Sequence, residues 1–181
     1  MNSKKEIVIL QKEDPRLRKI SAEVEYPMIK SKKMQEILSS LKLAIDSQSD
    51  AVAISAVQIG ELSRIFLISK KIFNILEDNK KPLNEVKKDL IFINPKITKL
   101  SKAKAWGEEG CLSVRFLYGK VNRSTHLTIE ALDENGNKII RNTSGLLAQI
   151  IQHENDHLNG VLFIDKAIEI QEILPENLQK I

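Results

Sequence analysis

The stretch QHENDH, residues 152–157, places two histidines four positions apart, with a glutamate directly after the first of them. In an α-helix, residues at positions i and i+4 lie one above the other on one face, so His153 and His157 would point the same way. Two imidazoles arranged in this way can bind one metal ion, and Glu154 would lie close enough to accept a proton from a water on that ion. The stretch therefore predicts a helix that carries a metal site.

The sequence on either side of this stretch predicts where the helix begins and ends. Leu147, Ile150 and Ile151 recur at helical spacing and would form its buried face. Ser144 is of a residue type that commonly caps the first turn, and Asn159–Gly160 is a typical stop signal. We therefore expect one helix between Ser144 and this stop signal.

The histidine pair alone leaves two interpretations open, because histidines with this spacing also occur on ordinary surface helices. The chain contains only three histidines, and two of them lie in this stretch. The stretch is also embedded in apolar sequence, where unpaired imidazoles and a carboxylate would be costly to bury. Both observations favour the metal site.

A catalytic site of the zinc type uses three protein ligands and leaves one position open for water. The best candidate for the third ligand is Cys111, the single cysteine of the chain, which lies in the segment EGCLS, residues 109–113. A thiolate binds divalent transition metals strongly. A lone cysteine is more often a small buried apolar residue, so the pattern by itself leaves both interpretations of Cys111 open.

The composition of the 181-residue chain is that of a globular domain, and we expect one domain over residues 1–181. The net charge of +4 comes with scattered lysines and few aromatic residues, which argues against a binder of single-stranded nucleic acid. A single cysteine excludes a disulfide framework and indicates a reducing compartment. Because no apolar run is long enough to cross a membrane and the N-terminus lacks signal-peptide character, we expect a cytoplasmic protein with no membrane partner.

Hydrophobic periodicity elsewhere predicts an amphipathic helix over residues 31–48 and a set of short strands. The expected strands cover residues 6–10, 64–68, 90–97, 124–132 and 138–141. Pro95 is expected to interrupt the third strand, and Asn135–Gly136 predicts a hairpin turn between the last two. Residues 70–89 should form a surface loop with one turn of helix at most, and the tail after Asp165 a short helix at most. This order is typical of an α+β domain with antiparallel pairing.

Three motifs give the sequence a resemblance to the peptide deformylases, which remove the N-formyl group from newly made bacterial polypeptides. AVAISAVQIG at residues 51–60 is similar to the family's first motif, and EGCLS at 109–113 and QHENDH at 152–157 match the second and third fully. The motifs occur in the family's order, and the resemblance extends from about residue 6 to residue 166. It implies antiparallel sheets packed around a central metal-binding helix.

The resemblance also implies a ligand set for the metal. Cys111, His153 and His157 would bind one divalent ion, with Fe(II) expected and nickel, cobalt or zinc able to occupy the same ligands. A Cys-His-His set does not by itself choose among these metals.

The catalytic residues that the resemblance implies act on an N-formylmethionyl peptide, bound as an extended strand beside residues 51–60. Hydroxide supplied by the metal would attack the formyl carbon, and Glu154 would serve as general base and then general acid. The side-chain amide of Gln58 and the backbone N–H of Leu112 would stabilise the oxyanion. No nucleophilic side chain is needed.

The sequence departs from the family's pattern beside these positions. Ala51 and Ala53 stand where the family usually has glycine, and Ser55 stands where alanine is usual. A methyl group at Ala53 would narrow a cleft in which peptide backbone has to approach closely. After EGCLS the family commonly has a proline, whereas here Val114–Phe116 follows, and its Arg115 is either an exposed charge or a contact to a substrate carbonyl. These changes leave substrate range open.

Two alternatives to a deformylase follow: a related hydrolase with a changed acyl substrate, and a catalytically idle relative that keeps its metal. The intact Gln58 and Glu154 argue against the idle relative, since a structural metal site needs neither. Bacterial members of the family often carry a basic C-terminal helix that contacts the ribosome. Residues 166–181 are mixed in charge and contain Pro175, which argues against ribosome contact through this tail.

Overall fold

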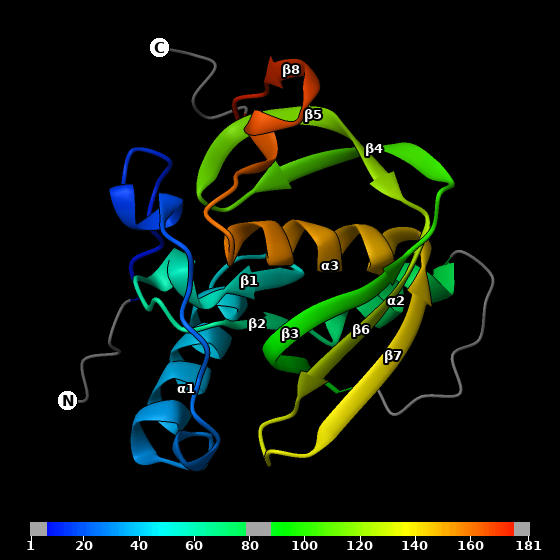
Figure 1. The fold of residues 1–181 in the computed structure, drawn as a ribbon. Coiled ribbons are helices and arrows are strands. Elements are labelled where there is room, and N and C mark those ends of the chain that lie inside the picture. The colour runs from blue at the N-terminus through cyan, green and yellow to red at the C-terminus, as the bar shows by residue number, and fades with distance from the viewer. Residues whose placement is uncertain (1–6, 79–87, 176–181) are drawn as a thin grey trace.

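The structure, a computed structural model, describes residues 7–78 and 88–175. Within these ranges the chain forms two antiparallel sheets, with the helix α3 (Gly145–His157) lying between them (Figure 1). The larger sheet has the strand order β1-β2-β3-β6-β7, and the smaller sheet has the order β4-β5-β8. The expected α+β class with antiparallel pairing is confirmed.

Four of the five strands of the larger sheet lie where strands are expected from the sequence, whereas β1 has no counterpart among the predicted elements. Its strands are β1 (Ala53–Ser55), β2 (Ile65–Ile68), β3 (Leu90–Leu100), β6 (His126–Leu132) and β7 (Lys138–Ser144). The smaller sheet consists of β4 (Lys104–Cys111), β5 (Val114–Ser124) and β8 (Ile168–Glu172). Besides α3, the described residues form the helices α1 (Lys32–Asp46) and α2 (Lys71–Asp78).

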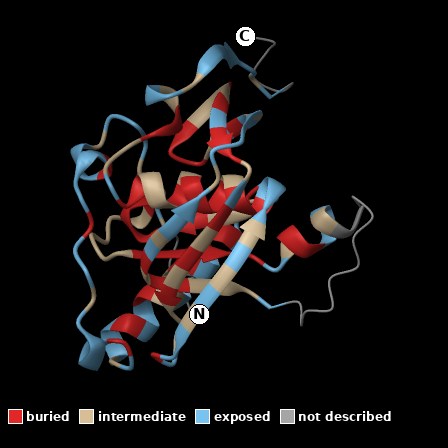
Figure 2. Ribbon diagram, turned by 45° about the vertical axis from the view of Figure 1, so that its right-hand side comes forward, coloured by how far each residue is buried: buried red, intermediate tan, exposed pale blue. Residues whose placement is uncertain are grey.

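Strand β2 is buried along its whole length and separates two layers of core. Its side chains Ile65 and Leu67 pack with the apolar face of α1, whereas Phe66 and Ile68 pack with α3 and with strands β3 and β6. Successive side chains of a strand point to opposite faces, so four consecutive apolar residues serve both layers. Figure 2 shows buried residues running through α3 and the sheet beside it. The larger sheet thus supports α3 from one side.

The expected helix over residues 31–48 is confirmed as α1. Its N-cap is Ser31, whose Oγ accepts a hydrogen bond of 3.2 Å from the backbone N–H of Met34. One face of the helix is apolar and buried, with Leu38 half-buried at its margin; its buried residues are Met34, Ile37, Leu41, Ala44 and Ile45. This face packs against β1 and β2 and supports the sheet edge on which the first motif lies.

Helix α3 also begins and ends where the sequence predicts. Ser144 occupies the N-cap position with extended backbone, although its side chain makes no capping hydrogen bond. The chain leaves the helix after His157 and turns through Gly160, whose φ of +73° favours glycine. In mid-helix the side-chain amide of Gln152 exchanges two hydrogen bonds, of 2.9 and 3.1 Å, with the backbone of Ser124. These bonds attach the helix to the last residue of β5, which pairs with the first residue of β4 in the smaller sheet.

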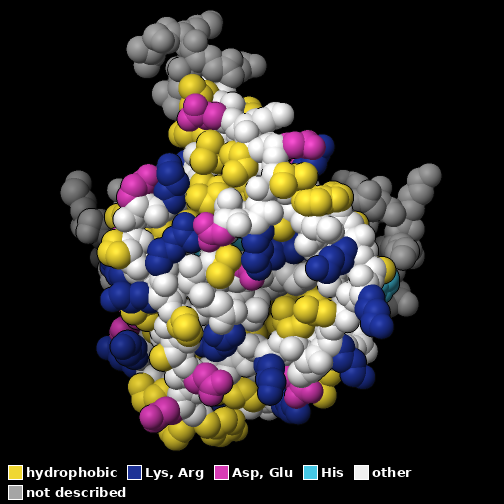
Figure 3. All heavy atoms as spheres, turned by 45° about the horizontal axis from the view of Figure 1, so that its top comes forward, with side chains coloured by type: hydrophobic (Ala, Val, Ile, Leu, Met, Phe, Trp, Pro, Cys, Tyr) yellow, Lys and Arg dark blue, Asp and Glu magenta, His cyan; other side chains and the backbone are white. Residues whose placement is uncertain are grey.

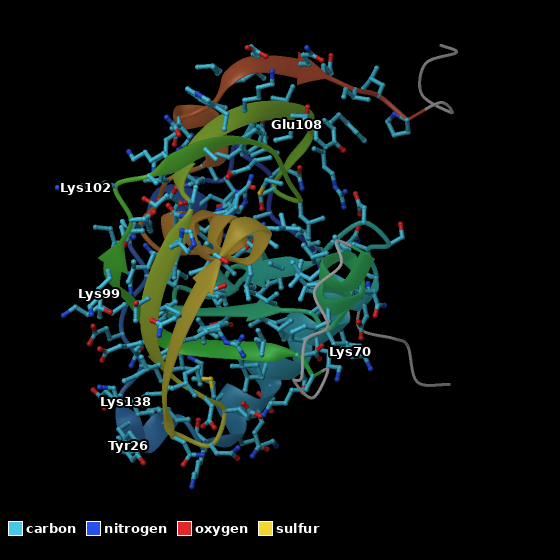
Figure 4. All side chains as sticks on the ribbon, turned by 90° about the vertical axis from the view of Figure 1, so that its right-hand side faces the viewer. Tyr26, Lys70, Lys99, Lys102, Glu108 and Lys138 are labelled. Atoms are coloured by element: carbon cyan, nitrogen blue, oxygen red, sulfur yellow. The ribbon has the colours of Figure 1, made fainter. Side chains whose placement is uncertain are left out.

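The hairpin between β6 and β7 has the predicted turn. Gly136 has a φ of +82°, and the Asp133 carboxylate accepts a hydrogen bond of 2.8 Å from the backbone N–H of Asn137. Figure 4 places Tyr26 at the same end of the molecule as Lys138, and a Cβ on Gly136 would lie 3.3 Å from the ring of Tyr26. Glycine therefore satisfies both the backbone conformation and the close approach.

Two predictions for the middle of the chain are wrong. Residues 71–78 form the eight-residue helix α2, with Ile72 and Phe73 buried, rather than a loop with a single turn. Residues 79–87 lie outside the described residues. Strand β3 extends to Leu100 rather than ending at residue 97. The interruption expected at Pro95 is present as a register shift with β6 between Ile93 and Lys96, next to a positive φ at Asn94.

The chain ends also differ from the prediction. Residues 7–10 of the expected strand over 6–10 form no strand, and the backbone N–H of Leu10 instead donates to the carbonyl of Gln58 at 2.8 Å. After Asp165 the chain forms strand β8 instead of a helix, and β8 pairs with β5. The long hairpin of β4 and β5 has no counterpart among the predicted elements.

Charged side chains are spread over the surface. Lysine and arginine are interspersed with other residue types on the face in Figure 3. Of the lysines labelled in Figure 4, Lys99 and Lys102 are neighbours at the end of β3, whereas Lys70 and Lys138 come from other parts of the chain. Among the described residues, no helix has the length and apolar content to span a membrane.

Candidate active site

The three predicted metal ligands meet in space. His153 and His157 extend from one face of α3 with their ring centroids 4.9 Å apart, and Cys111 reaches them from the end of β4. One ligand atom from each of the three residues lies within 4.8 Å of the other two, and Cys111 Sγ is 3.2 Å from His157 Nε2. A sulfur and two imidazole nitrogens in this arrangement fit a single transition-metal ion.

Cys111 is positioned by the tight connection between β4 and β5. Its backbone pairs with Val114, so the chain reverses within Leu112 and Ser113, and the backbone N–H of Ser113 donates to the sulfur at 3.4 Å. The preceding Gly110 lies against Tyr118, where a Cβ would be only 2.7 Å from the ring. The glycine of EGCLS therefore permits the close packing of the hairpin that carries Cys111.

A buried network that the sequence reasoning missed orients His153. Glu109 Oε2 lies 2.8 Å from His153 Nδ1, and Arg123 binds both oxygens of Glu109 at 2.8 and 2.9 Å. Arg123 also pairs with Asp156 at 2.5 Å, and Lys166 contacts the same carboxylate at 2.7 Å. With Nδ1 held by a carboxylate, the other ring nitrogen of His153 is free to bind a metal.

The charges of this network determine the protonation of the site. Burial alone would raise the pKa of Glu109, but hydrogen bonds from Arg123 and His153 outweigh it and lower that pKa to about 2. Burial alone would lower the pKa of His153, but its contacts with Cys111 and Glu109 raise it well above the ordinary value. Burial and the neighbouring His153 lower the pKa of His157 well below its usual value. Without a metal, the network therefore favours a proton on His153 and a neutral His157. Metal ligation requires both rings to be neutral, so a bound ion would replace the proton of His153.

Glu154 lies on α3 next to the cluster and is 3% exposed. Its Oε2 accepts a hydrogen bond of 2.5 Å from the hydroxyl of Ser55, which also lies 3.2 Å from the Glu154 carbonyl oxygen. Burial raises the pKa of Glu154, although the charge of His153 and the Ser55 hydrogen bond oppose this effect. A carboxylate with a raised pKa is suited to transferring protons near neutral pH.

Gln58 lies in the short 3₁₀ helix Ala56–Ile59, directly after β1. Its side-chain oxygen accepts from the backbone N–H of Ser55 at 2.8 Å, so its amide nitrogen faces the opposite way. That nitrogen donates to Ser113 Oγ at 3.1 Å and lies 3.5 Å from Cys111 Sγ. The Gln58 amide and the connection that contains Leu112 therefore lie together beside the Cys-His-His cluster.

A cleft with a volume of about 570 Å³ opens onto these residues. Its lining includes Gln58, Cys111, Leu112, His153 and Glu154. Residues 50–53 form one side, while residues from the β4–β5 hairpin and residues 173–175 form others. Both alanines that replace the usual glycines, at positions 51 and 53, belong to this lining.

Arg115 is neither a free surface charge nor an unpaired group available to a substrate, because it already has partners within the chain. Its side chain is 32% exposed, its guanidinium lies 3.7 Å from Asp50, and it donates a hydrogen bond to Gln48. Arg115 and Asp50 both line the cleft, from different parts of the chain. The ion pair therefore joins two sides of the opening.

A cysteine sulfur and two imidazoles beside a buried carboxyl group, with a cleft leading to them, are the side chains of a metal-dependent hydrolase. The fold and the site together define a metallohydrolase built on two antiparallel sheets.

Comparisons with known proteins identify the family. Residues 6–172 match the family model described as polypeptide deformylase, and the chain belongs to this family of metalloenzymes. A peptide deformylase of Psychrobacter cryohalolentis is 43% identical over 157 residues, which cover 87% of this chain and 77% of that protein. The resemblance inferred from the three motifs is confirmed.

Solved structures of peptide deformylases share the fold. A Met-Ala-Ser complex of the class I type b enzyme from Acinetobacter baumannii has a TM-score of 0.76 at 26% identity, covering 87% of this chain and 96% of that one. An actinonin complex of the enzyme from Synechococcus elongatus has a TM-score of 0.73 at 28% identity, covering 89% and 78%.

Proposed function

We propose that this chain is a peptide deformylase in which Cys111, His153 and His157 bind one divalent metal ion and Glu154 transfers protons. The observation that carries the proposal is the convergence of one sulfur and two imidazoles, distant in sequence, beside a buried carboxylate in a cleft. The family supports removal of the formyl group from N-formylmethionyl peptides. Residues 1–181 would act as one catalytic domain in the cytoplasm, with α3 as its central metal-binding helix.

A metal ion in this site would polarise the formyl group and lower the pKa of a water molecule toward neutrality. Glu154 accepts a proton from the attacking water while the water oxygen bonds to the formyl carbon. It then delivers this proton to the amine nitrogen as the C–N bond breaks. Formate and a free N-terminal amine result. The amide of Gln58 and the backbone N–H of Leu112 donate hydrogen bonds to the oxyanion that develops on the formyl oxygen.

Fe(II) is the proposed native metal, by analogy with the family. The thiolate and imidazole ligands would also accept nickel, cobalt or zinc, so metal analysis of protein purified without air decides the identity. If iron is native, exposure to air should reduce activity as iron and thiolate oxidise.

The substrate would bind as an extended peptide along β1. This strand lies at the edge of the larger sheet, and Ala51, Val52 and Ala53 line the cleft, so an extended peptide could add to the sheet at this edge. The Met-Ala-Ser peptide in the Acinetobacter baumannii structure supports a peptide of this class. Neither a membrane nor a nucleic acid enters this proposal, and no ribosome contact through the tail is proposed.

Release of formate from formyl-Met-Ala-Ser by anaerobically prepared, iron-loaded protein tests the function. A Glu154→Gln variant should keep its metal and lose about two to four orders of magnitude in rate. A metal-loaded wild type that releases no formate would instead indicate the catalytically idle relative.

A second candidate function rests on Ala51 and Ala53, which place methyl groups at the cleft. A related hydrolase with a changed acyl substrate would cleave another N-acyl-Met-Ala-Ser peptide faster than the formyl peptide. Parallel assays of the formyl and acetyl peptides distinguish the two functions.

A further inference from the structure

Ser55 contacts both side chains that are proposed to act on the formyl group. It lies at the end of β1 and is completely buried. Its backbone N–H donates to the side-chain oxygen of Gln58 at 2.8 Å, and its hydroxyl donates to Glu154 Oε2 at 2.5 Å. The first bond is available to any residue at this position, whereas the second needs a hydroxyl.

The hydroxyl is a feature of this chain rather than of the first motif, where alanine is usual. Among residues 7–78 and 88–175, Ser55 is the hydrogen-bond donor to the Glu154 carboxylate. The same Oγ lies 3.2 Å from the backbone carbonyl oxygen of Glu154, so Ser55 contacts both the side chain and the backbone of that residue. Hydrogen bonds to an ionised carboxylate are shorter and stronger than those between neutral groups, and the distance of 2.5 Å from Ser55 Oγ to Glu154 Oε2 lies in their range.

We infer that Ser55 is a positioning residue for Glu154. Its hydroxyl holds Oε2 against β1, so the carboxylate cannot rotate freely within its buried site, and Oε1 is left for proton transfer at the cleft. This inference rests on the proposed function, because it assigns Ser55 a role through the proton transfer of Glu154. Ser55 itself touches neither substrate nor metal in the proposed reaction.

The consequence of removing the hydroxyl follows from this geometry. In Ser55→Ala the carboxylate loses its donor while the backbone N–H that holds Gln58 remains. Small misplacements of a reacting group reduce rates by up to about 100-fold, so we expect kcat to fall by about 10- to 100-fold. KM should change less than threefold, since the peptide contacts are unaffected, and the metal content should match that of the wild type. The thermal midpoint should fall, because a buried carboxylate loses its hydrogen-bond donor.

The matched control is Ser21→Ala. Ser21 is another buried serine, 3% exposed, and its hydroxyl has no hydrogen-bond partner among the described residues. It lies outside the cleft lining. Ser21→Ala therefore also removes a buried hydroxyl, but away from the cleft. Its kcat and KM should equal those of the wild type.

A double-mutant cycle with Glu154→Gln provides the decisive test, measured as formate release from formyl-Met-Ala-Ser at high enzyme concentration. If Ser55 acts through Glu154, adding Ser55→Ala to Glu154→Gln should slow the reaction less than twofold further. A full 10- to 100-fold further loss, an unchanged kcat in Ser55→Ala, or a kcat loss that only follows lost metal would each overturn the inference. An inactive wild type would refute the proposed function instead, which separates the two failures.

Discussion

Replacement of Glu109 by glutamine should show how strongly the buried ionic network stabilises the fold and orients the metal site. Glu109 is 6% exposed and accepts from Arg123 with both oxygens while it holds His153 Nδ1. Glu109→Gln keeps the size of the side chain and removes its charge. Arg123 retains Asp156 as a partner, so the variant should still fold.

The magnitude follows from the pKa of Glu109, which the fold lowers from 4.5 to about 2. One pKa unit corresponds to about 1.4 kcal/mol, so ionised Glu109 contributes about 3 kcal/mol to the free energy of unfolding at neutral pH. Because the pKa is lower in the folded state, this contribution is complete above about pH 5 and is lost as the pH falls toward 2. The difference between wild type and variant should shrink to about 1 kcal/mol near pH 3.

Urea unfolding of the metal-free proteins at several pH values between 7 and 3 measures this difference. Glu130→Gln is the control, because its ion pair with Lys138 lies on the surface and its loss should leave unfolding nearly unchanged. In the metal-loaded proteins, Glu109→Gln should weaken metal binding by about 10- to 100-fold, since His153 loses its orienting carboxylate. A difference in unfolding free energy that stays constant with pH would refute the ionic explanation and indicate a packing defect.

Three further perturbations test other parts of the structure. Gln58→Ala should lower kcat for formate release by about two to three orders of magnitude with little change in metal content; an unchanged kcat would remove Gln58 from the oxyanion site. Phe92→Ala should lower the free energy of unfolding by about 3–5 kcal/mol, because Phe92 is buried and stacks on Phe66 with ring centroids 4.7 Å apart. Gly160→Ala should lower the thermal midpoint, because its φ is +73° and the new Cβ would lie 2.5 Å from the carbonyl oxygen of Arg18; a wild-type midpoint would contradict this reasoning.

The parts of the fold that the sequence predicts are those whose periodicity is strong. Helix α1 and helix α3 have apolar residues at helical spacing, and β6 and β7 flank a recognisable Asn-Gly turn, so their positions follow from local pattern. The spacing within a helix places His153 and His157 on one face, and the resemblance to the family adds Cys111 as the third proposed ligand. No local pattern places Cys111 beside them, since that contact depends on the β4–β5 hairpin.

The errors have a common physical cause in tertiary contacts. Strand β8 is exposed along its length, including Ile168 and Ile170, and it is held by its pairing with β5 rather than by burial of one face. Ile7 and Ile9 pack against the core although their segment forms no strand. Alternating apolar residues predict such packing equally for a strand and for an irregular segment. Arg123 lies in the sequence between EGCLS and QHENDH, and it contacts Glu109 of the first motif and Asp156 of the second. These contacts form only in the folded chain, so the sequence pattern does not indicate the network.

X-ray absorption at the metal edge of anaerobically purified protein identifies the ligand atoms of the metal site themselves. The spectrum should show one sulfur neighbour at about 2.3 Å and two imidazole nitrogens, with the sulfur lost in Cys111→Ser. A spectrum without a sulfur neighbour, or one that Cys111→Ser leaves unchanged, would contradict the assignment of Cys111, His153 and His157 as the ligands of one metal ion.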